Sequence, residues 1–201
     1  MGWKDAERSS EGSADYLTIT PNTTKMIRIL LKAGEEPLSY WTHYIPLGEG
    51  KGRTVICPGR DECPACKSGN YKTARKHSMN VYDFEDKTVK VYEAGNTVVQ
   101  QLGLIGDQFG CKENGWNEIN ISIRRTGKGL ETQYMVIPVP AKDKLDTSKM
   151  KTIDLTAIKS PHKAAVIADL MQGKITKREN TPEKGPVRAK EVIADVVAGF
   201  K

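Results

Sequence analysis

Long apolar runs are missing from this sequence. No stretch approaches the ~18–20 consecutive apolar residues that a membrane-spanning helix needs. The first residues, MGWKDAERSSEGSADY, contain no apolar signal core. These absences argue against a membrane partner and a secretory leader, and we expect a cytoplasmic protein.

Cysteine and histidine are scarce, with four and three residues in a chain of 201. In a reducing cytoplasm thiols stay free, so a cysteine cluster favours a metal or redox site over a disulfide framework. Three of the cysteines and one histidine stand in a single stretch, HYIPLGEGKGRTVICPGRDECPACKSGNYKTARK. Cys111 stands alone, and we interpret it as an ordinary free cysteine.

Enzymatic patterns are missing as well. Zinc deaminases need H-x-E before their P-C-x-x-C motif, whereas Tyr44 and Ile45 follow His43 here. No clustered carboxylates of the nuclease type occur, and no small-molecule substrate is indicated. A thioredoxin-like redox pair is disfavoured by the third cysteine and by the lack of a βαβ pattern. We therefore expect a protein that is not an enzyme.

Positive charge is present and is local. The formal net charge is +6, and residues 51–76 hold seven Lys and Arg against two acids, a surplus of five. Most of the excess charge thus accompanies the cysteines, which favours an anionic partner for this segment.

Hydrophobic alternation predicts a mainly β fold with a few helices. The strand patterns are YLTIT, MIRILL, LSYWTHYI, RTVIC, NVYDF, TVKVYEA and two strands around TGKG in the segment 117–140. Helical patterns cover 96–110 and 160–171, and a short helix is expected over 66–76.

Glycine turns between short strands favour a small Greek-key barrel, most simply an OB-like five-stranded one, and the pattern alone also permits a sandwich. The cysteine cluster is expected to form a zinc-binding subdomain inserted in this fold. The expected organisation is a flexible N-terminus over 1–15, an OB-fold core over 16–158 and a C-terminal helical segment over 159–201. The zinc subdomain is expected at about 43–78 within the core.

The cysteine spacing predicts a metal site. Cys57-x5-Cys63-x2-Cys66 supplies three soft ligands, and tetrahedral zinc needs a fourth. His43 is favoured because a hairpin across LGEGKG brings it close to Cys57, and His77 is the alternative. A site with four protein ligands has no open position for water, so we expect structural Zn²⁺ that clamps the basic loop.

Basic residues interleaved with aromatic ones predict a surface for single-stranded nucleic acid. Lys and Arg neutralise phosphates, and aromatic rings stack on bases at ~1–3 kcal/mol each. The candidates are Arg28, Lys51, Arg53, Lys67, Tyr71, Lys72, Arg75, Lys76, Lys90, Tyr92, Arg124, Arg125, Lys128 and Tyr134. We interpret Tyr40, Trp41, Tyr44 and Trp116 as packing in the core or at the barrel rim.

The ordered motif His43-x13-Cys57-x5-Cys63-Pro64-x-Cys66, followed by Arg75-Lys76 and by VKVYEAG before a helix, resembles a known family. It is similar to the zinc-containing helix-destabilising single-stranded DNA-binding proteins of T-even and related bacteriophages. The resemblance spans roughly residues 25–137. It implies an OB-fold core, a zinc subdomain with one His and three Cys ligands, and a basic, aromatic cleft between them.

Residue by residue, the resemblance implies that His43, Cys57, Cys63 and Cys66 bind zinc. Arg75 and Lys76 match a basic pair of the family's cleft, Tyr92 matches a tyrosine near the end of a strand, and Arg28 lies in a similar IRIL strand. It also implies an infected bacterial cell as location and phage replication or recombination proteins as partners. The family's basic N-terminal arm and acidic C-terminal tail have no counterpart in MGWKDAERSS or in the net positive residues 176–201.

Two functions are therefore considered. The first is a single-stranded DNA-binding protein that coats and protects unpaired strands in replication, recombination and repair, largely without sequence preference. The alternative is a zinc-ribbon-type interaction module that binds RNA or a protein partner through the basic loop.

Overall fold

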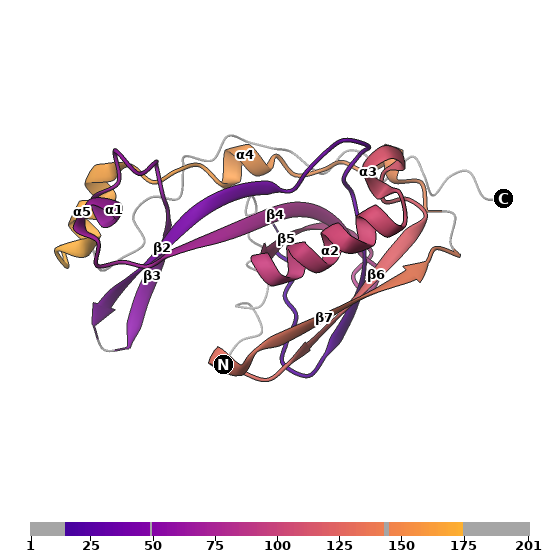
Figure 1. Ribbon diagram of the computed structural model, residues 1–201, viewed down its shortest axis with the longest axis horizontal. Helices are drawn as coiled ribbons and strands as arrows, with labels where there is room; N and C mark the ends of the chain where they lie inside the picture. Colours follow the sequence, from indigo (N-terminus) through magenta and orange to yellow (C-terminus); the bar gives the residue numbers. More distant parts are fainter. Residues whose placement is uncertain (1–14, 49, 143–144, 175–201) are drawn as a thin grey trace, which may run out of the picture. The chain divides into compact units, whose positions relative to one another are not determined.

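Antiparallel strands form most of the computed structural model, which describes residues 15–48, 50–142 and 145–174 (Figure 1). The strands are β1 (Thr24–Ile29), β2 (Leu38–Gly48), β3 (Lys51–Ile56), β4 (Thr73–Asp83), β5 (Thr88–Gly95), β6 (Ile119–Thr126) and β7 (Gln133–Pro140). The expected flexible N-terminus lies almost entirely outside the described residues, as does the C-terminal segment from residue 175 onward.

The seven strands belong to one sheet with the order β3-β2-β4-β1-β6-β7, and β5 pairs with β4. β1 and β2 follow one another along the same edge of β4, since Ile29 lies opposite Val81 and Leu38 opposite Ser78. The prediction of a mainly β fold is confirmed. The sheet of the described residues is open, because β5 and β7 do not pair, so the five-stranded barrel is not confirmed.

The free edge of β7 is protected from pairing by a proline of β7 and by a side chain of helix α2 (Asn96–Gln108). The Gln101 amide donates to the Tyr134 carbonyl at 3.3 Å and accepts from the Val136 N–H at 3.2 Å, as a neighbouring strand would. Farther along, Pro138 has no N–H to offer. This edge is therefore poorly suited to pairing with another strand.

Besides α2, the described helices are α1 (Pro64–Ser68), α3 (Cys111–Asn114), α4 (Leu155–Ile158) and α5 (Ala164–Met171), with 3₁₀ turns at Gly129–Glu131 and Thr147–Lys149. The expected helix over 66–76 is wrong. α1 ends at Ser68 because Gly69 takes a left-handed conformation, with φ of 69°, and β4 begins four residues later.

The larger hydrophobic cluster, which we call the main core, lies between one face of β1, β4, β5 and β6 and helix α2. It contains Leu17, Ile19, Ile27, Ile29, Leu31, Met79, Val81, Tyr92, Ala94, Val98, Leu102, Ile105, Cys111, Trp116, Ile119, Ile121 and Ile123. Alternate residues of each strand supply it, as the period of two requires.

A smaller cluster, the core of what we call the metal lobe, joins the β2–β3 hairpin to α1 and α5. It contains Ile45, Val55, Cys63, Ala65, Ile167 and Leu170. The lobe therefore combines segments more than a hundred residues apart in sequence, and α1 and α5 are in contact (Figure 1).

The opposite face of the sheet is strapped by the chain between β7 and α5. The Glu93 carboxylate on β5 accepts from the Tyr40 hydroxyl at 2.6 Å and from Lys159 Nζ at 2.7 Å, and it lies 3.5 Å from Lys76 Nζ. Burial alone would raise the pKa of Glu93, but the hydrogen bonds from Lys159 and Tyr40 outweigh it and hold the pKa below 4.5. The strap is thus fixed by a charged hydrogen-bond network.

Among the residues that the structure describes, no helix is both long and apolar enough to cross a membrane.

Candidate functional site

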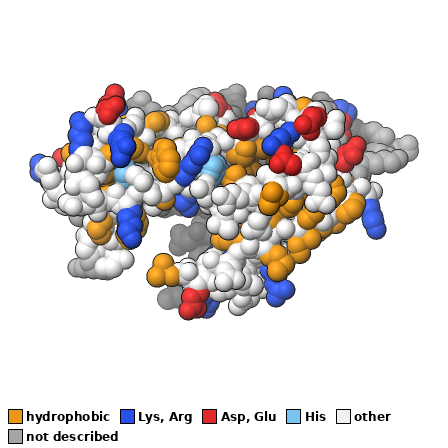
Figure 2. Space-filling view, viewed as in Figure 1, with side chains coloured by type: hydrophobic (Ala, Val, Ile, Leu, Met, Phe, Trp, Pro, Cys, Tyr) orange, Lys and Arg blue, Asp and Glu red, His pale blue; other side chains and the backbone are white. Residues whose placement is uncertain are grey.

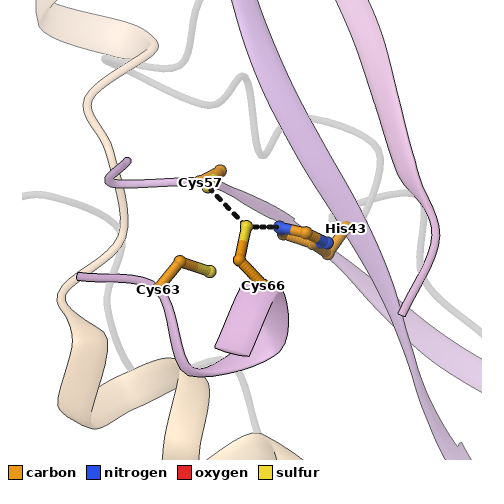
Figure 3. Close-up of side chains that lie close together, drawn as sticks. All are labelled: His43, Cys57, Cys63 and Cys66. Carbon is orange, nitrogen blue, oxygen red and sulfur yellow. Dashed lines mark hydrogen bonds between the residues drawn. The ribbon is translucent and has the colours of Figure 1, made fainter. Parts of the chain in front are cut away.

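Four side chains converge in the metal lobe (Figure 3). The ligand atoms of His43, Cys57, Cys63 and Cys66 all lie within 4.8 Å of one another. Cys66 Sγ is 3.6 Å from Cys57 Sγ and 3.3 Å from His43 Nε2. The structure thus brings together the predicted ligands, and they could bind a metal ion.

Local structure explains the convergence. His43 on β2 lies opposite Val55 on β3, and the ladder continues past β3 because the Cys57 N–H donates to the Trp41 carbonyl at 2.8 Å. Alternate and directly opposed residues share a face, so His43 and Cys57 point to the same side of the hairpin. Cys63 precedes Pro64 at the start of α1, and one helical turn carries Cys66 back toward it.

His77, the alternative ligand, is committed elsewhere. Its Nδ1 lies 2.8 Å from Ser39 Oγ and its Nε2 lies 2.8 Å from Asn96 Oδ1. Because the Asn96 oxygen only accepts, Nε2 carries a proton and Nδ1 is free to accept from the Ser39 hydroxyl. His77 therefore bridges β2, β4 and α2 at the border of the main core, away from the cysteines.

The electrostatics of the cluster favour a cation. Burial, together with the neighbouring thiols of Cys57 and Cys63, raises the pKa of Cys66 to about 12. A positive ion at the centre would reverse this balance, because it stabilises thiolates directly. Among the described residues, His43 Nδ1 is buried without a hydrogen-bond partner, while its Nε2 faces the sulfurs.

The C-terminal part of the described chain closes the metal lobe. The Ile56 N–H donates to His162 Nδ1 and the His162 N–H donates to the Ile56 carbonyl, both at 3.0 Å. Burial, and the charge of Arg53, lower the pKa of His162, so its ring stays neutral and accepts at Nδ1. This pair of bonds ties His162, two residues before the start of α5, to Ile56, the residue next to Cys57.

Three of the predicted nucleic-acid contacts are buried, and the structure corrects their assignment. Arg28 is 1% exposed, donates to Asn120 Oδ1 from Nε at 2.9 Å and from Nη2 at 2.7 Å, and lies over the Phe84 ring. The face of β1 opposite the main core is covered there, so Arg28 does not reach a surface. Its role is structural.

Lys90 and Tyr92 are likewise buried. The Lys90 ammonium is enclosed by the carboxylates of Asp83, Asp86 and Asp15. Tyr92 belongs to the main core, and burial raises the pKa of its phenol. Lys90 and Tyr92 therefore stabilise the fold and cannot contact a nucleic-acid strand in this conformation.

The other predicted contacts fall into two groups. Beside the metal lobe lie Lys51, Arg53, Lys67, Tyr71, Lys72, Arg75 and Lys76, and on the β6–β7 hairpin lie Arg124, Arg125, Lys128 and Tyr134. Lys51, Lys67, Lys72, Arg75, Arg124 and Lys128 are exposed, while the rest are half-buried. Figure 2 shows Lys and Arg side chains over the part of the molecule that Figure 1 labels β2, β3 and α1.

Exposed aromatic side chains were missed by the sequence-based interpretation. Trp41 is 52% exposed and Tyr44 is 55% exposed, although both were expected to pack. Trp41 lies opposite Arg75 on β4, whose guanidinium carbon is 6.0 Å from the centre of the indole ring. The sequence does place Trp41 on the same face of β2 as the ligand His43, two residues away, but alternation does not indicate that this part of the face is exposed.

Trp41 and Arg75 form the centre of an uncovered strip. Ser39 and Trp41 of β2 and Thr73 and Arg75 of β4 lie on the same face as both clusters, and all four are exposed. Helices α1 and α5 cover this face on the metal-lobe side and α2 covers it on the main-core side. We call these four residues the floor strip.

Comparison of the chain with protein-family models, with curated proteins and with solved structures gives no match.

Proposed function

We propose that this chain is a non-catalytic single-stranded DNA-binding protein with a structural zinc ion. In this proposal it coats unpaired strands during replication, recombination and repair, largely without sequence preference. The observation that carries the proposal is the exposed Trp41 beneath Arg75, on a strip of sheet between two helix-covered regions. An indole and a guanidinium on one floor offer a base a stacking surface and a phosphate a cation.

Zinc is supported by the ligand set and its spacing. Ligands at the usual ~2.3 Å (sulfur) and ~2.0 Å (nitrogen) from a tetrahedral zinc ion lie about 3.5–3.8 Å apart. The distances of 3.6 and 3.3 Å from Cys66 Sγ are close to that spacing before any ion is placed. His43 would bind through Nε2, and the three thiolates would complete a closed site that holds the lobe together.

The charge around the floor strip supports an anionic strand. Lys67 lies in the last turn of α1, Lys72 precedes β4, and both side chains are exposed. Lys76 is less available, because its ammonium lies 3.5 Å from Glu93. The β6–β7 hairpin, with Arg124 and Lys128 exposed, offers a second basic region for a longer strand.

The connectivity supports an OB-like core. Leaving aside the β2–β3 hairpin, the strand order is β5-β4-β1-β6-β7, and α2 connects β5 to β6. We propose that these strands are an open form of the five-stranded Greek-key barrel, which commonly binds oligonucleotides. Proteins of phage replication or recombination remain expected partners on the resemblance alone.

The test is a binding titration with a fluorescent oligo-dT, a duplex and an RNA of matched length. The proposal predicts preference for the single DNA strand and a steep loss of affinity as salt rises, since phosphate contacts release counterions. Preference for the duplex, or affinity that is independent of salt, would refute it. Preference for RNA would support the interaction module instead.

A further inference from the structure

A pocket of about 380 Å³ opens beside the floor strip, between α2 and the sheet. Its walls are apolar, formed by Ile29, Leu31 and Met79 of the sheet side and by Val99, Leu102 and Trp116. Ser39 and Arg75 of the floor strip line it as well. Its volume lies in the range of ~300–1,000 Å³ that is typical of small-ligand sites. We call it the helix pocket.

Gly103 keeps the helix pocket open. It lies in the middle of α2, where glycine is less favourable than alanine. Gly106, one turn later, has a packing reason, since an added Cβ would lie 3.2 Å from Trp116. Gly103 has none: its φ is not positive, and a Cβ there would meet no atom within 4 Å. The missing side chain at Gly103 leaves room in the pocket and does nothing for packing.

The polar groups at the helix pocket select a neutral ring over a phosphate. Glu35 and Glu36 line it and disfavour an anion inside. Lys112 also lines it, but its ammonium lies 2.5 Å from Asp107. His77 is held by Ser39 and Asn96, so this part of the wall is fixed before a ligand arrives. Carboxylates and apolar walls together suit a nucleobase with N–H donors.

Arg75 links the helix pocket to the proposed strand path. Its guanidinium lies over the ring of Trp41, and the same residue lines the pocket. A base that leaves the stack on Trp41 could enter the pocket while its phosphate stays beside Arg75.

We propose that the helix pocket binds one nucleobase of the strand, turned out from the stack on Trp41. This proposal rests on the proposed function. The pocket would fix the position of the bound strand, since a base held between α2 and the sheet cannot slide freely. It would also favour unpaired strands, because a base in a duplex cannot be turned out without breaking its pair.

The experiment fills the pocket and removes the base. Gly103→Leu places a side chain in the pocket, and Gln100→Leu places the same side chain on the exposed side of α2. Both variants and wild type are titrated with an oligo-dT of about 12 nucleotides and with copies that carry one abasic site at each position in turn. The thermal unfolding midpoint of each protein is recorded in parallel.

In wild type, we expect one abasic position to cost about tenfold in affinity. Gly103→Leu should lose about the same factor with the intact oligonucleotide and then show no further loss at that abasic position. Its unfolding midpoint should stay equal or rise, because leucine favours helix over glycine. Gln100→Leu should bind as wild type does, and Trp41→Ala should keep its sensitivity at the pocket position.

Wild-type affinity in Gly103→Leu, or an abasic penalty that the variant does not remove, would overturn the helix-pocket proposal alone. Unchanged affinity with a lowered unfolding midpoint would also overturn it and would indicate that a segment of this chain fills the pocket. A wild-type protein that binds no single strand would overturn the proposed function as well.

Discussion

The main core and the metal lobe differ in how much apolar surface holds them together. The main core contains 17 buried residues and the metal lobe contains six, two of which come from α5. Small hydrophobic cores seldom fold without a staple. A metal ion bound by His43 and the three cysteines would supply one to the lobe, whereas the larger main core does not need one.

The two regions also differ in whether their cationic side chains are buried or exposed. The strands that carry the main core also bury two cations, Arg28 and Lys90, each of which is paired inside the fold. The metal lobe leaves Lys51, Lys67 and Lys72 exposed around a small folded centre. The floor strip lies where the two regions meet on one face of the sheet.

Metal removal should give the largest effect and should separate the two regions. Structural zinc contributes an apparent ~10–16 kcal/mol in small domains, so Cys63→Ser or a chelator should unfold the metal lobe and leave the main core folded. Hydrogen exchange should show fast amides in β3, α1 and α5 and slow amides in β6. Cys111→Ala, a buried thiol of the main core, should keep one metal ion per chain by native mass spectrometry. Retention of the metal by Cys63→Ser would contradict the ligand assignment.

Arg28→Ala should show that a buried cation stabilises the fold and does not bind DNA. It removes two donors from the buried Asn120 oxygen, and we expect a loss of about 2–3 kcal/mol in urea unfolding. Oligo-dT affinity of the folded variant should not change. Lys67→Ala, on the exposed side of α1, should do the reverse, with wild-type stability and weaker binding at low salt. Equal losses of affinity in both variants would contradict the distinction.

Trp41→Ala tests the floor strip. A stacked base contributes ~1–3 kcal/mol, so we expect about a tenfold loss of oligo-dT affinity or more with little change in stability. Tyr44→Ala is the matched control, because Tyr44 is equally exposed but lies on the other face of β2. A larger loss of affinity in Tyr44→Ala would indicate that the DNA strand binds on the face of the sheet that carries Tyr44.

Glu93→Gln should give the smallest effect, because solvent screening weakens the interactions of the Glu93 carboxylate. The loss of stability should be present at neutral pH and disappear in acid. The pKa of Glu93 is lowered in the folded state, so its stabilisation is complete above its unfolded pKa of about 4.5 and is lost as the pH falls through the folded value. The stability difference between wild type and Glu93→Gln should therefore shrink below pH ~4.5. A difference that grows toward low pH would contradict the hydrogen-bond network around Glu93.

The sequence was most informative where the structure depends on short-range spacing. Cys57, Cys63 and Cys66 are brought together by one turn and one helical turn, and His43 by the hairpin register. Tandem hairpins and the helix after Gly95 also follow from local patterns.

Face exposure could not be predicted in the same way. Arg28 does point away from Ile27 and Ile29, but Asn120 and Phe84 cover it, and both come from distant parts of the chain. Trp41 was expected to pack because large aromatic residues usually do, yet none of the described helices covers its part of the sheet. The contribution of α5 to the metal lobe also depends on tertiary contacts with α1 and β2, which alternation cannot reveal.

The most direct test of the central claim is tryptophan fluorescence during an oligo-dT titration, in the metal-loaded protein and after chelation. The chain has three tryptophans, so the titration uses a Trp3→Phe background, which leaves the buried Trp116 and the exposed Trp41. Bound bases should quench mainly Trp41, and a base in the helix pocket should add a smaller contribution from Trp116, which lines that pocket. We predict strong quenching in the metal-loaded protein, loss of most of it when Trp41→Phe is added, and much weaker binding once the metal is removed. Quenching that is undiminished by Trp41→Phe, or binding that is unaffected by chelation, would contradict a floor strip held beside a metal-dependent lobe.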